Sequence, residues 1–172
     1  SSQKAPGVSY FGANEEIYTP DQIMRTTLNK AAVAINDLFR RSVSYPTFSW
    51  DDLDAIHRES KISAADHILM KIRILLHDET LTEITPAIIK AANAVYVKNK
   101  KSDSMRDMYR KLDHSRWLRF YTFYNWTYGP ARDDLARQHP MLCPYEELNA
   151  EQKRERDAAW ELLSCLATDT FL

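Results

Sequence analysis

The sequence predicts an all-α fold, a compact bundle of about six helices with a long ordered loop between the last two. The chain has only three glycines in 172 residues, which is few for a fold rich in β-turns. No stretch alternates between apolar and polar residues as a half-buried strand does. Several segments instead repeat apolar residues at helical spacing. A chain of 172 residues fits one domain, or two small domains that share a core.

The first half of the chain predicts three helices. The first begins at Thr19 and Pro20 and runs to about residue 41, because threonine caps helices and proline suits the first helical position. The segment 44–47 contains a proline and ends this helix. Ser49 is expected to cap a short second helix, and a third helix begins near Ser60 and runs to about residue 76. The apolar residues that support them are Ile23, Leu28, Ala31, Ile35, Leu38 and Phe39, then Trp50, Leu53 and Ile56, then Ala64, Ile68, Ile72 and Leu75.

The next two helices have clear start signals. Thr85 and Pro86 open a fourth helix that runs to about residue 98. Ser102 or Asp103 caps a fifth helix, which ends near residue 124. Bulky residues lie on two sides of the fifth helix, so we expect both sides to be covered. One side carries His114, Trp117, Tyr121 and Tyr124, and the other carries Met105, Tyr109, Leu112, Phe120 and Phe123.

A loop and a last helix complete the chain. Gly129 can take a positive φ angle and Pro130 cannot continue a helix, so these residues end the fifth helix. Trp126 stands on the exit loop, where its ring can fold back over the fifth helix. Asn149 and Gln152 then frame the start of the last helix.

Composition and short motifs exclude several function classes. The formal net charge of −1 argues against a general nucleic-acid binder. No apolar run approaches the roughly 20 residues that cross a bilayer, so direct membrane insertion is not expected. Cys143 and Cys165 match no metal or redox spacing, which indicates a reducing, cytoplasmic compartment. The chain also lacks a glycine-rich phosphate loop, an HExxH motif and a nucleophile elbow, so it is expected to be neither an enzyme nor a holder of a cofactor or metal.

Three stretches of the second half carry a family resemblance. They are HSRW at 114–117, NWTYGPARDD at 125–134 and HPMLCPYEEL at 139–148. This pattern resembles the RyR domain, the repeat first named from ryanodine receptors and present in many bacterial and phage proteins. The usual pattern has Gly-Trp where this chain has Asn125 and Trp126, and it has HPCL where this chain displaces the cysteine to Cys143. The resemblance covers about residues 106–160.

The resemblance implies a domain organisation and a role. We expect residues 1–18 to be a flexible segment or linker and residues 19–172 to be one all-helical RyR-type domain. Within it, residues 19–100 would form an N-terminal helical part and residues 101–168 the core of the repeat. Bacterial members of the family sit beside NAD-binding, potassium-transport, signalling or defence modules, which implies a sensory or regulatory part of a larger system.

A ligand pocket is the sharpest functional hypothesis. Heteroaromatic rings stack on tryptophan or tyrosine, and guanidinium groups bind phosphate oxygens, so the residues near the exit loop suit an adenine-nucleotide-like or nucleotide-derived signal. The same aromatic residues could instead fill the core, and His139 with its proline could be scaffold. The candidate residues are His114, Arg116, Trp117, Tyr121, Trp126, Tyr128, Arg132 and His139.

A second polar cluster could bind phosphate. Ser60, Ser63 and His67 fall on one face of the expected third helix, close to its N-terminus, where backbone N–H groups favour anions. An ordinary helix cap would explain Ser60 equally well.

The leading interpretation is a non-catalytic, regulatory ligand-binding module. The alternative is a protein-interaction or oligomerisation module, whose partner would be a second copy of the chain or a fused or associated effector or transport module. A third option is an RNA-binding helical module that uses the basic turn 98–101, but the near-neutral charge argues against it.

Overall fold

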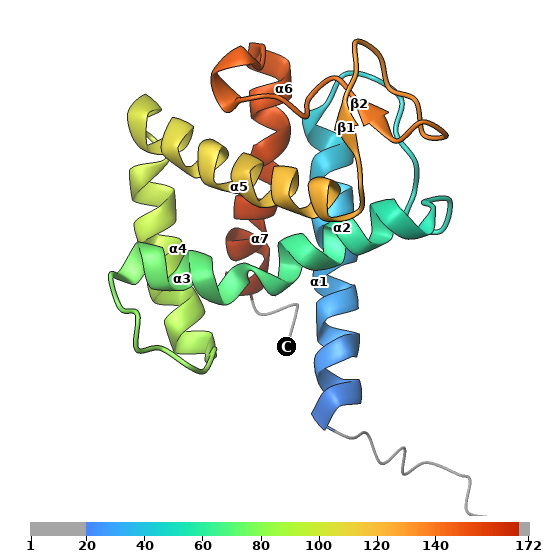
Figure 1. Ribbon diagram of the computed structural model, residues 1–172. Helices are drawn as coiled ribbons and strands as arrows, with labels where there is room; N and C mark the ends of the chain where they lie inside the picture. The colour runs from blue at the N-terminus through green and yellow to red at the C-terminus, as the bar shows by residue number, and fades with distance from the viewer. Residues whose placement is uncertain (1–19, 169–172) are drawn as a thin grey trace, which may run out of the picture.

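The computed structural model describes residues 20–168, with side chains from Thr27 onward. The flexible segment expected over residues 1–18 lies outside the described residues, as does the side chain of Ile23. The prediction of an all-α fold is confirmed, and a long loop does separate α5 from the last helices (Figure 1). The helices are α1 (Pro20–Ser42), α2 (Ala55–Asp66), α3 (Ile68–Leu76), α4 (Pro86–Asn99), α5 (Asp103–Phe123), α6 (Ala150–Arg154) and α7 (Ala158–Ala167).

The helix boundaries in the segment 49–76 differ from the expectation. No helix starts at Ser49, whose hydroxyl instead donates to the Asp52 carboxylate at 2.5 Å. Asp54 caps α2, because its carboxylate accepts a hydrogen bond from the His57 backbone N–H at 2.9 Å. The single helix expected from Ser60 to about residue 76 is divided at His67 into α2 and α3. Ser60 therefore lies in the middle of a helix rather than at its start.

Most other boundaries follow the local signals in the sequence. The Thr85 hydroxyl accepts a hydrogen bond from the Ile88 N–H at 3.3 Å, and Pro86 takes the first helical position of α4. Asn149 and Gln152 each accept a hydrogen bond from the backbone N–H of the other at 2.9 Å. This reciprocal capping box satisfies two N–H groups that have no partner inside the helix.

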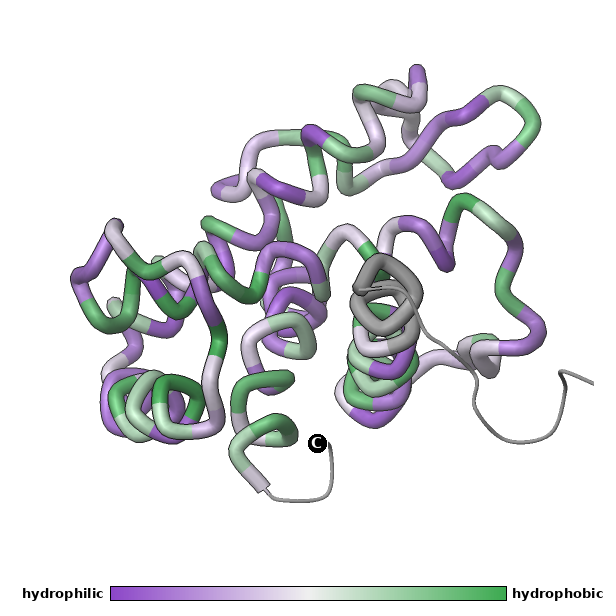
Figure 2. Tube along the Cα trace, turned by 90° about the horizontal axis from the view of Figure 1, so that it is seen from below, coloured by the Kyte–Doolittle hydropathy of each residue, from purple (hydrophilic) through white to green (hydrophobic). Residues whose placement is uncertain are grey.

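Helix α7 lies at the centre of the bundle. It packs against α1 and α4, α3 packs against α4, and α2 bridges α1 and α5. Figure 1 shows α3 and α4 together at one end of the molecule, with the loop after α5 at the other. Figure 2 shows hydrophobic and hydrophilic stretches in turn along the helices, as expected when each helix buries one face.

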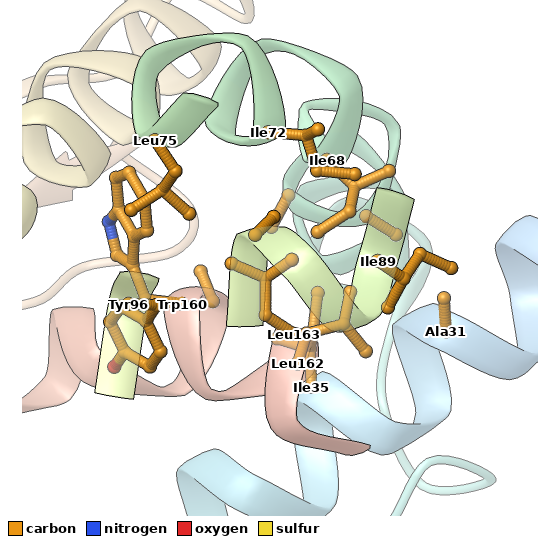
Figure 3. Close-up of a cluster of buried hydrophobic side chains, with 14 of the residues drawn as sticks. Ala31, Ile35, Ile68, Ile72, Leu75, Ile89, Tyr96, Trp160, Leu162 and Leu163 are labelled. Atoms are coloured by element: carbon orange, nitrogen blue, oxygen red, sulfur yellow. The ribbon is translucent and has the colours of Figure 1, made fainter. Parts of the chain in front are cut away.

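The main core is aliphatic with one aromatic group. Ile68, Ile72 and Leu75 of α3 point toward Leu162 and Leu163 of α7 in Figure 3, and all five side chains are buried. In the same core, Trp160 packs on Tyr96 and Tyr109, with ring centroids 6.0 and 4.4 Å away. This core fixes α1, α3, α4 and α7 against one another, and α5 reaches it through Tyr109.

The loop of residues 124–149 is ordered by a turn and a small sheet. Asn125 has a φ of 62°, which turns the chain after α5 and lets the Trp126 N–H donate to the Tyr121 carbonyl at 3.0 Å. The strands β1 (Thr127–Tyr128) and β2 (Gln138–His139) then pair in parallel. The prediction that Gly129 ends the helix with a positive φ was wrong, because no described glycine has one. Gly129 is needed for close approach instead, since a Cβ there would lie 2.7 Å from the Gln138 Cβ.

The two sides of α5 are covered unequally. Trp117 and Tyr121 of the first side are buried. The second side is covered only in part, because Tyr109 is buried in the main core, whereas Phe123 is 81 % exposed and Leu112 faces solvent. The buried side of α5 is defined by the residues that meet the loop of residues 124–149 and α7.

Candidate functional site

The loop of residues 124–149 is held on α5 by a cluster of aromatic side chains. The Tyr121 ring lies 4.6 Å from the Trp117 ring and 5.2 Å from the Trp126 ring, and it meets the latter edge to face. Trp117 and Trp126 are only 8 % and 5 % exposed. We name this group the aromatic cluster; its buried members are Trp117, Tyr121, Trp126, Met141, Tyr145 and Leu148. The Trp126 ring does fold back over α5, but it is buried in this cluster and does not line a cavity.

A cavity of about 640 Å³ lies beside the aromatic cluster. It is bounded by α1, α2, α5, the turn of residues 45–54 and the loop of residues 124–149, together with the 3-10 turn η2 (Glu155–Asp157). The structure brings six of the predicted site residues to its wall: Ser60, Arg116, Trp117, Tyr121, Arg132 and His139. These residues come from α2, α5 and the loop, so only the tertiary fold joins them.

The buried part of the cavity wall is strongly charged. Arg116 donates from its Nε to the Asp113 carboxylate at 2.9 Å, and both side chains are almost fully buried. Arg156 donates from Nη2 to the Glu155 carboxylate at 3.1 Å, and its guanidinium carbon lies 5.0 Å from the centre of the Trp117 ring. The Arg116 charge opposes the effect of burial and holds the Asp113 pKa below its usual range. This wall therefore remains charged at neutral pH.

Lys61 is the third basic residue of this wall. Its Nζ lies 3.8 Å from the centre of the Phe39 ring, and within the described residues it forms no ion pair. Desolvation lowers the Lys61 pKa to about 7, and the nearby charges of Arg156 and Arg116 add to this effect. A lysine in this position exchanges its proton near neutral pH.

His139 joins the cavity to the aromatic cluster. Its ring meets Trp117 edge to face at 5.1 Å, and its Nδ1 accepts a hydrogen bond from the Met141 N–H at 3.1 Å. Burial and the Arg132 and Arg156 charges lower the His139 pKa to about 4. The ring is therefore neutral at pH 7, with its proton on Nε2.

The outer edge of the cavity is closed by a polar network between the loop and α2. Arg132 donates to His57 Nε2 at 2.7 Å and to the Asp134 carboxylate at 2.7 Å. Since Arg132 can only donate, His57 Nε2 accepts, and the Nδ1–H of His57 donates to Asp54 at 2.5 Å. Arg132 and Asp134 remain about half exposed, so solvent reaches this edge.

Three of the predicted pocket residues lie elsewhere. His114 is almost fully buried, and its Nε2–H donates to the Cys143 carbonyl at 2.8 Å, which makes it part of the scaffold. Burial lowers its pKa, although the Cys143 carbonyl opposes this. Trp126 is buried in the aromatic cluster, and Tyr128 is 60 % exposed on β1. The structure therefore does not bring these three residues to the cavity wall.

The predicted phosphate cluster is divided. Ser60 lines the first cavity, where a hydrogen bond with Tyr121 opposes the increase in the Tyr121 pKa that burial causes. Ser63 and His67 line a second cavity on the other side of Arg116, about 840 Å³ in volume. The expected position at a helix N-terminus was wrong, because α2 begins at Ala55.

Sequence reasoning found Arg116 but did not include Lys61 and Arg156, the other two basic residues of the buried wall. No part in the site was predicted for Arg156, yet its side chain is only 5 % exposed and lines the cavity. A signal was present, because Arg156 precedes the buried Trp160 by four residues and so shares its helical face. His57 and Lys61 gave no comparable signal, since their roles depend on the loop and on α1.

Two further features bear on the class of site. Among residues 20–168, no three or more side chains of the His, Cys, Asp or Glu type gather closely enough to hold a metal ion. Within the same residues, no helix is long and apolar enough to cross a bilayer.

A comparison with protein families places part of the chain in a known family. A family model described as the RyR domain matches residues 90–170, from within α4 through α5, the loop of residues 124–149 and α7. The resemblance seen over about residues 106–160 lies inside this range. No curated protein and no solved structure matched the chain.

Proposed function

Residues 90–170 of this chain are an RyR domain, and from this premise we propose that the chain is a non-catalytic regulatory module that binds a nucleotide-like ligand. The ligand site is the cavity between α2, α5 and the loop of residues 124–149. The family supports a regulatory or interaction role, and the contents of the cavity support the ligand class.

One observation carries the proposal: a single cavity combines aromatic faces with guanidinium groups. Trp117 and Tyr121 contribute rings to its wall, and Arg116, Arg132 and Arg156 contribute cations. A base can stack on such rings, and a phosphate can accept paired hydrogen bonds from an arginine. A cavity of about 640 Å³ lies within the range of ordinary small-molecule sites.

Regulation would act through the loop of residues 124–149. The loop is joined to α2 across the cavity by the Arg132–His57 hydrogen bond, so a ligand there contacts both elements. A ligand that binds one loop arrangement better than another shifts the population toward it. A partner that contacts the loop would then detect the ligand.

Titration calorimetry tests the proposal with adenine nucleotides, cyclic dinucleotides and ADP-ribose. We expect at least one of them to bind, and Arg132→Gln to weaken its binding by about tenfold or more through the loss of a charge-assisted contact. Arg154→Gln is the matched control, because Arg154 is exposed on α6 and away from the cavity wall. Absence of heat and of thermal shift with every compound would refute the proposal.

A second candidate function rests on exposed apolar side chains. Leu135 at the tip of the loop is 99 % exposed, and Phe123 and Tyr128 are also largely exposed. Such residues are common in protein interfaces. The partner we propose is a second copy of the chain, and an associated effector or transport module is the other candidate. Light scattering would show a concentration-dependent dimer that Leu135→Asp abolishes, whereas a monomer at every concentration would exclude the self-association.

The free thiols of Cys143 and Cys165 fit a reducing compartment, and we therefore propose a cytoplasmic location. Fractionation of the native cells would test this proposal, and recovery of the protein from an oxidising compartment would contradict it.

A further inference from the structure

We infer that the buried end of the cavity, formed by Lys61, Arg116 and Arg156, is a subsite for a singly charged phosphoryl group of the phosphodiester type. This inference rests on the proposed function and assigns the charged part of its ligand. We name these three residues the basic trio. All three line the same cavity, and they come from α2, α5 and η2.

The carboxylates of this wall are already engaged. Asp113 accepts from Arg116 at 2.9 Å. Glu155 accepts from Arg156 at 3.1 Å through one oxygen and from the Tyr45 hydroxyl at 2.8 Å through the other. Lys61 has no carboxylate partner within the described residues. At this buried end three cations therefore face two carboxylates, and one positive charge is uncompensated there when Lys61 is protonated. The other carboxylates that line the cavity are bonded to Ser49, His57, Arg132 and Ser44; they are Asp52, Asp54, Asp134 and Glu151.

Arg156 supplies an independent sign that an acceptor belongs here. Its Nε–H is buried and has no hydrogen-bond partner among the described residues, although the side chain lines the cavity. A buried donor without a partner costs free energy, and an anionic oxygen would satisfy it. The same guanidinium lies 5.0 Å from the centre of the Trp117 ring, so an anion bound to it would lie beside the aromatic wall of the cavity.

The charge balance selects the type of anion. One uncompensated positive charge matches a phosphodiester, which carries one negative charge. A phosphomonoester near neutral pH carries about 1.5 to 2 negative charges, so it would leave an excess of negative charge among buried groups. A carboxylate has the right charge but two oxygens in one plane, which suits one arginine better than three separate cations.

Binding should be coupled to the protonation of Lys61. The charged groups facing Lys61 are Arg116 and Asp113 on α5 and Arg156 and Glu155 on η2. Its pKa of about 7 means that the free site holds this proton only in part at neutral pH, and an anion beside the amine raises that pKa. The bound anion should therefore be accompanied by proton uptake.

The test uses three small anions that keep their charge between about pH 6 and pH 8: dimethyl phosphate, sulfate and acetate. At equal ionic strength we expect dimethyl phosphate to give the largest thermal shift. Its affinity should fall by about tenfold from pH 6 to pH 8, as Lys61 loses its proton. A larger shift with sulfate or acetate would overturn the assignment to a phosphodiester.

Two variants locate the site. Lys61→Met keeps the aliphatic chain over Phe39 and should abolish both the binding and its pH dependence, whereas Lys98→Met, on the exposed end of α4, should change neither. Arg156→Lys keeps the charge but removes the Nε–H, and should weaken binding by about tenfold. If Lys61→Met or Arg156→Lys folds and binds as the parent does, the subsite is wrong.

The outcomes also separate this inference from the proposed function. Nucleotide binding that is unaffected in the Lys61 and Arg156 variants would overturn the subsite and leave the proposed function standing. Failure of every nucleotide and every small anion to bind the parent chain would overturn both.

Discussion

Trp160 and Trp117 are both buried indoles, yet their surroundings differ. Trp160 is enclosed by Tyr96 and Tyr109, and its Nε1–H donates to the Tyr109 carbonyl at 2.7 Å. Trp117 packs on Tyr121 on one side and lies under the Arg156 guanidinium on the other. The first region joins helices, and the second holds a loop and forms the wall of a charged cavity. A buried cation lies near each ring, since the Lys71 Nζ is 5.6 Å from the centre of the Trp160 ring, so neither burial nor a neighbouring charge separates scaffold from site. The difference lies in the packing partner: other helices surround Trp160, whereas the loop of residues 124–149 meets Trp117.

The largest effect is expected where the helical core is emptied. Trp160→Ala removes a buried ring and its hydrogen bond, and should lower the free energy of unfolding by about 3–5 kcal/mol. Chemical denaturation followed by circular dichroism measures this. Trp160→Phe keeps most of the packing and should lose less. A loss below about 1 kcal/mol in the alanine variant would show that α7 does not organise the bundle.

The second largest effect on stability is expected from loss of the buried Asp113–Arg116 ion pair, which lies between the main core and the cavity. Asp113 carries the charge that balances Arg116, and it also interacts with Lys71, which is buried beneath the main core and donates to the Ala159 carbonyl at 2.7 Å. Asp113→Asn leaves these cations without a carboxylate and should lower the free energy of unfolding by about 3 kcal/mol. The exposed Asp103→Asn is the control and should change it by less than about 0.5 kcal/mol. Equal losses in the two variants would contradict the role of Asp113.

A decrease in pH should destabilise the region around His139, beside the cavity, before it destabilises the main core. The His139 pKa is lowered to about 4 in the folded chain, so the unfolded chain binds more protons between about pH 6.5 and pH 4. The contribution of His139 to the free energy of unfolding is therefore complete above about pH 6.5. It decreases by on the order of 2–3 kcal/mol as the pH falls toward 4. Amide hydrogen exchange at pH 7 and pH 5 should show earlier loss of protection at Met141 than at Ile72.

Variants of two histidines sharpen this test. His139→Asn keeps an acceptor for the Met141 N–H and should reduce the pH dependence. His77→Asn should preserve it, because His77 is exposed and has a φ of 52°, which asparagine tolerates. Uniform loss of protection in both regions, unchanged in His139→Asn, would argue against a separate response of the cavity side.

The smallest effect is expected within the loop itself. Gly129→Ala places a Cβ 2.7 Å from the Gln138 Cβ, so β1 and β2 must separate slightly. We expect a loss of about 1–2 kcal/mol and weaker ligand binding, with the main core unchanged. Thermal unfolding and exchange at the Gln138 amide measure this. Unchanged stability would mean that the strand pair adapts freely and does not fix the loop.

Local chemistry determined much of the helical framework. The Thr85–Pro86 start of α4 and the Asn149–Gln152 capping box depend on residues within three positions of each other, so the sequence alone predicts them. The same is true of the aromatic stripe of α5 that carries Trp117 and Tyr121. Local signals failed where two caps competed, since Asp54 rather than Ser49 starts α2.

Only the tertiary structure decided which of these residues form a site. The sequence correctly predicted four neighbours in the cavity wall, which are Arg116, Trp117, Arg132 and His139. It also included His114, which is buried away from the cavity and donates a hydrogen bond to the Cys143 carbonyl. It assigned no role to Arg156, whereas the fold buries that guanidinium over Trp117. The physical reason is range: capping and periodicity act over a few residues, while desolvation and charge pairing depend on elements that only folding brings together.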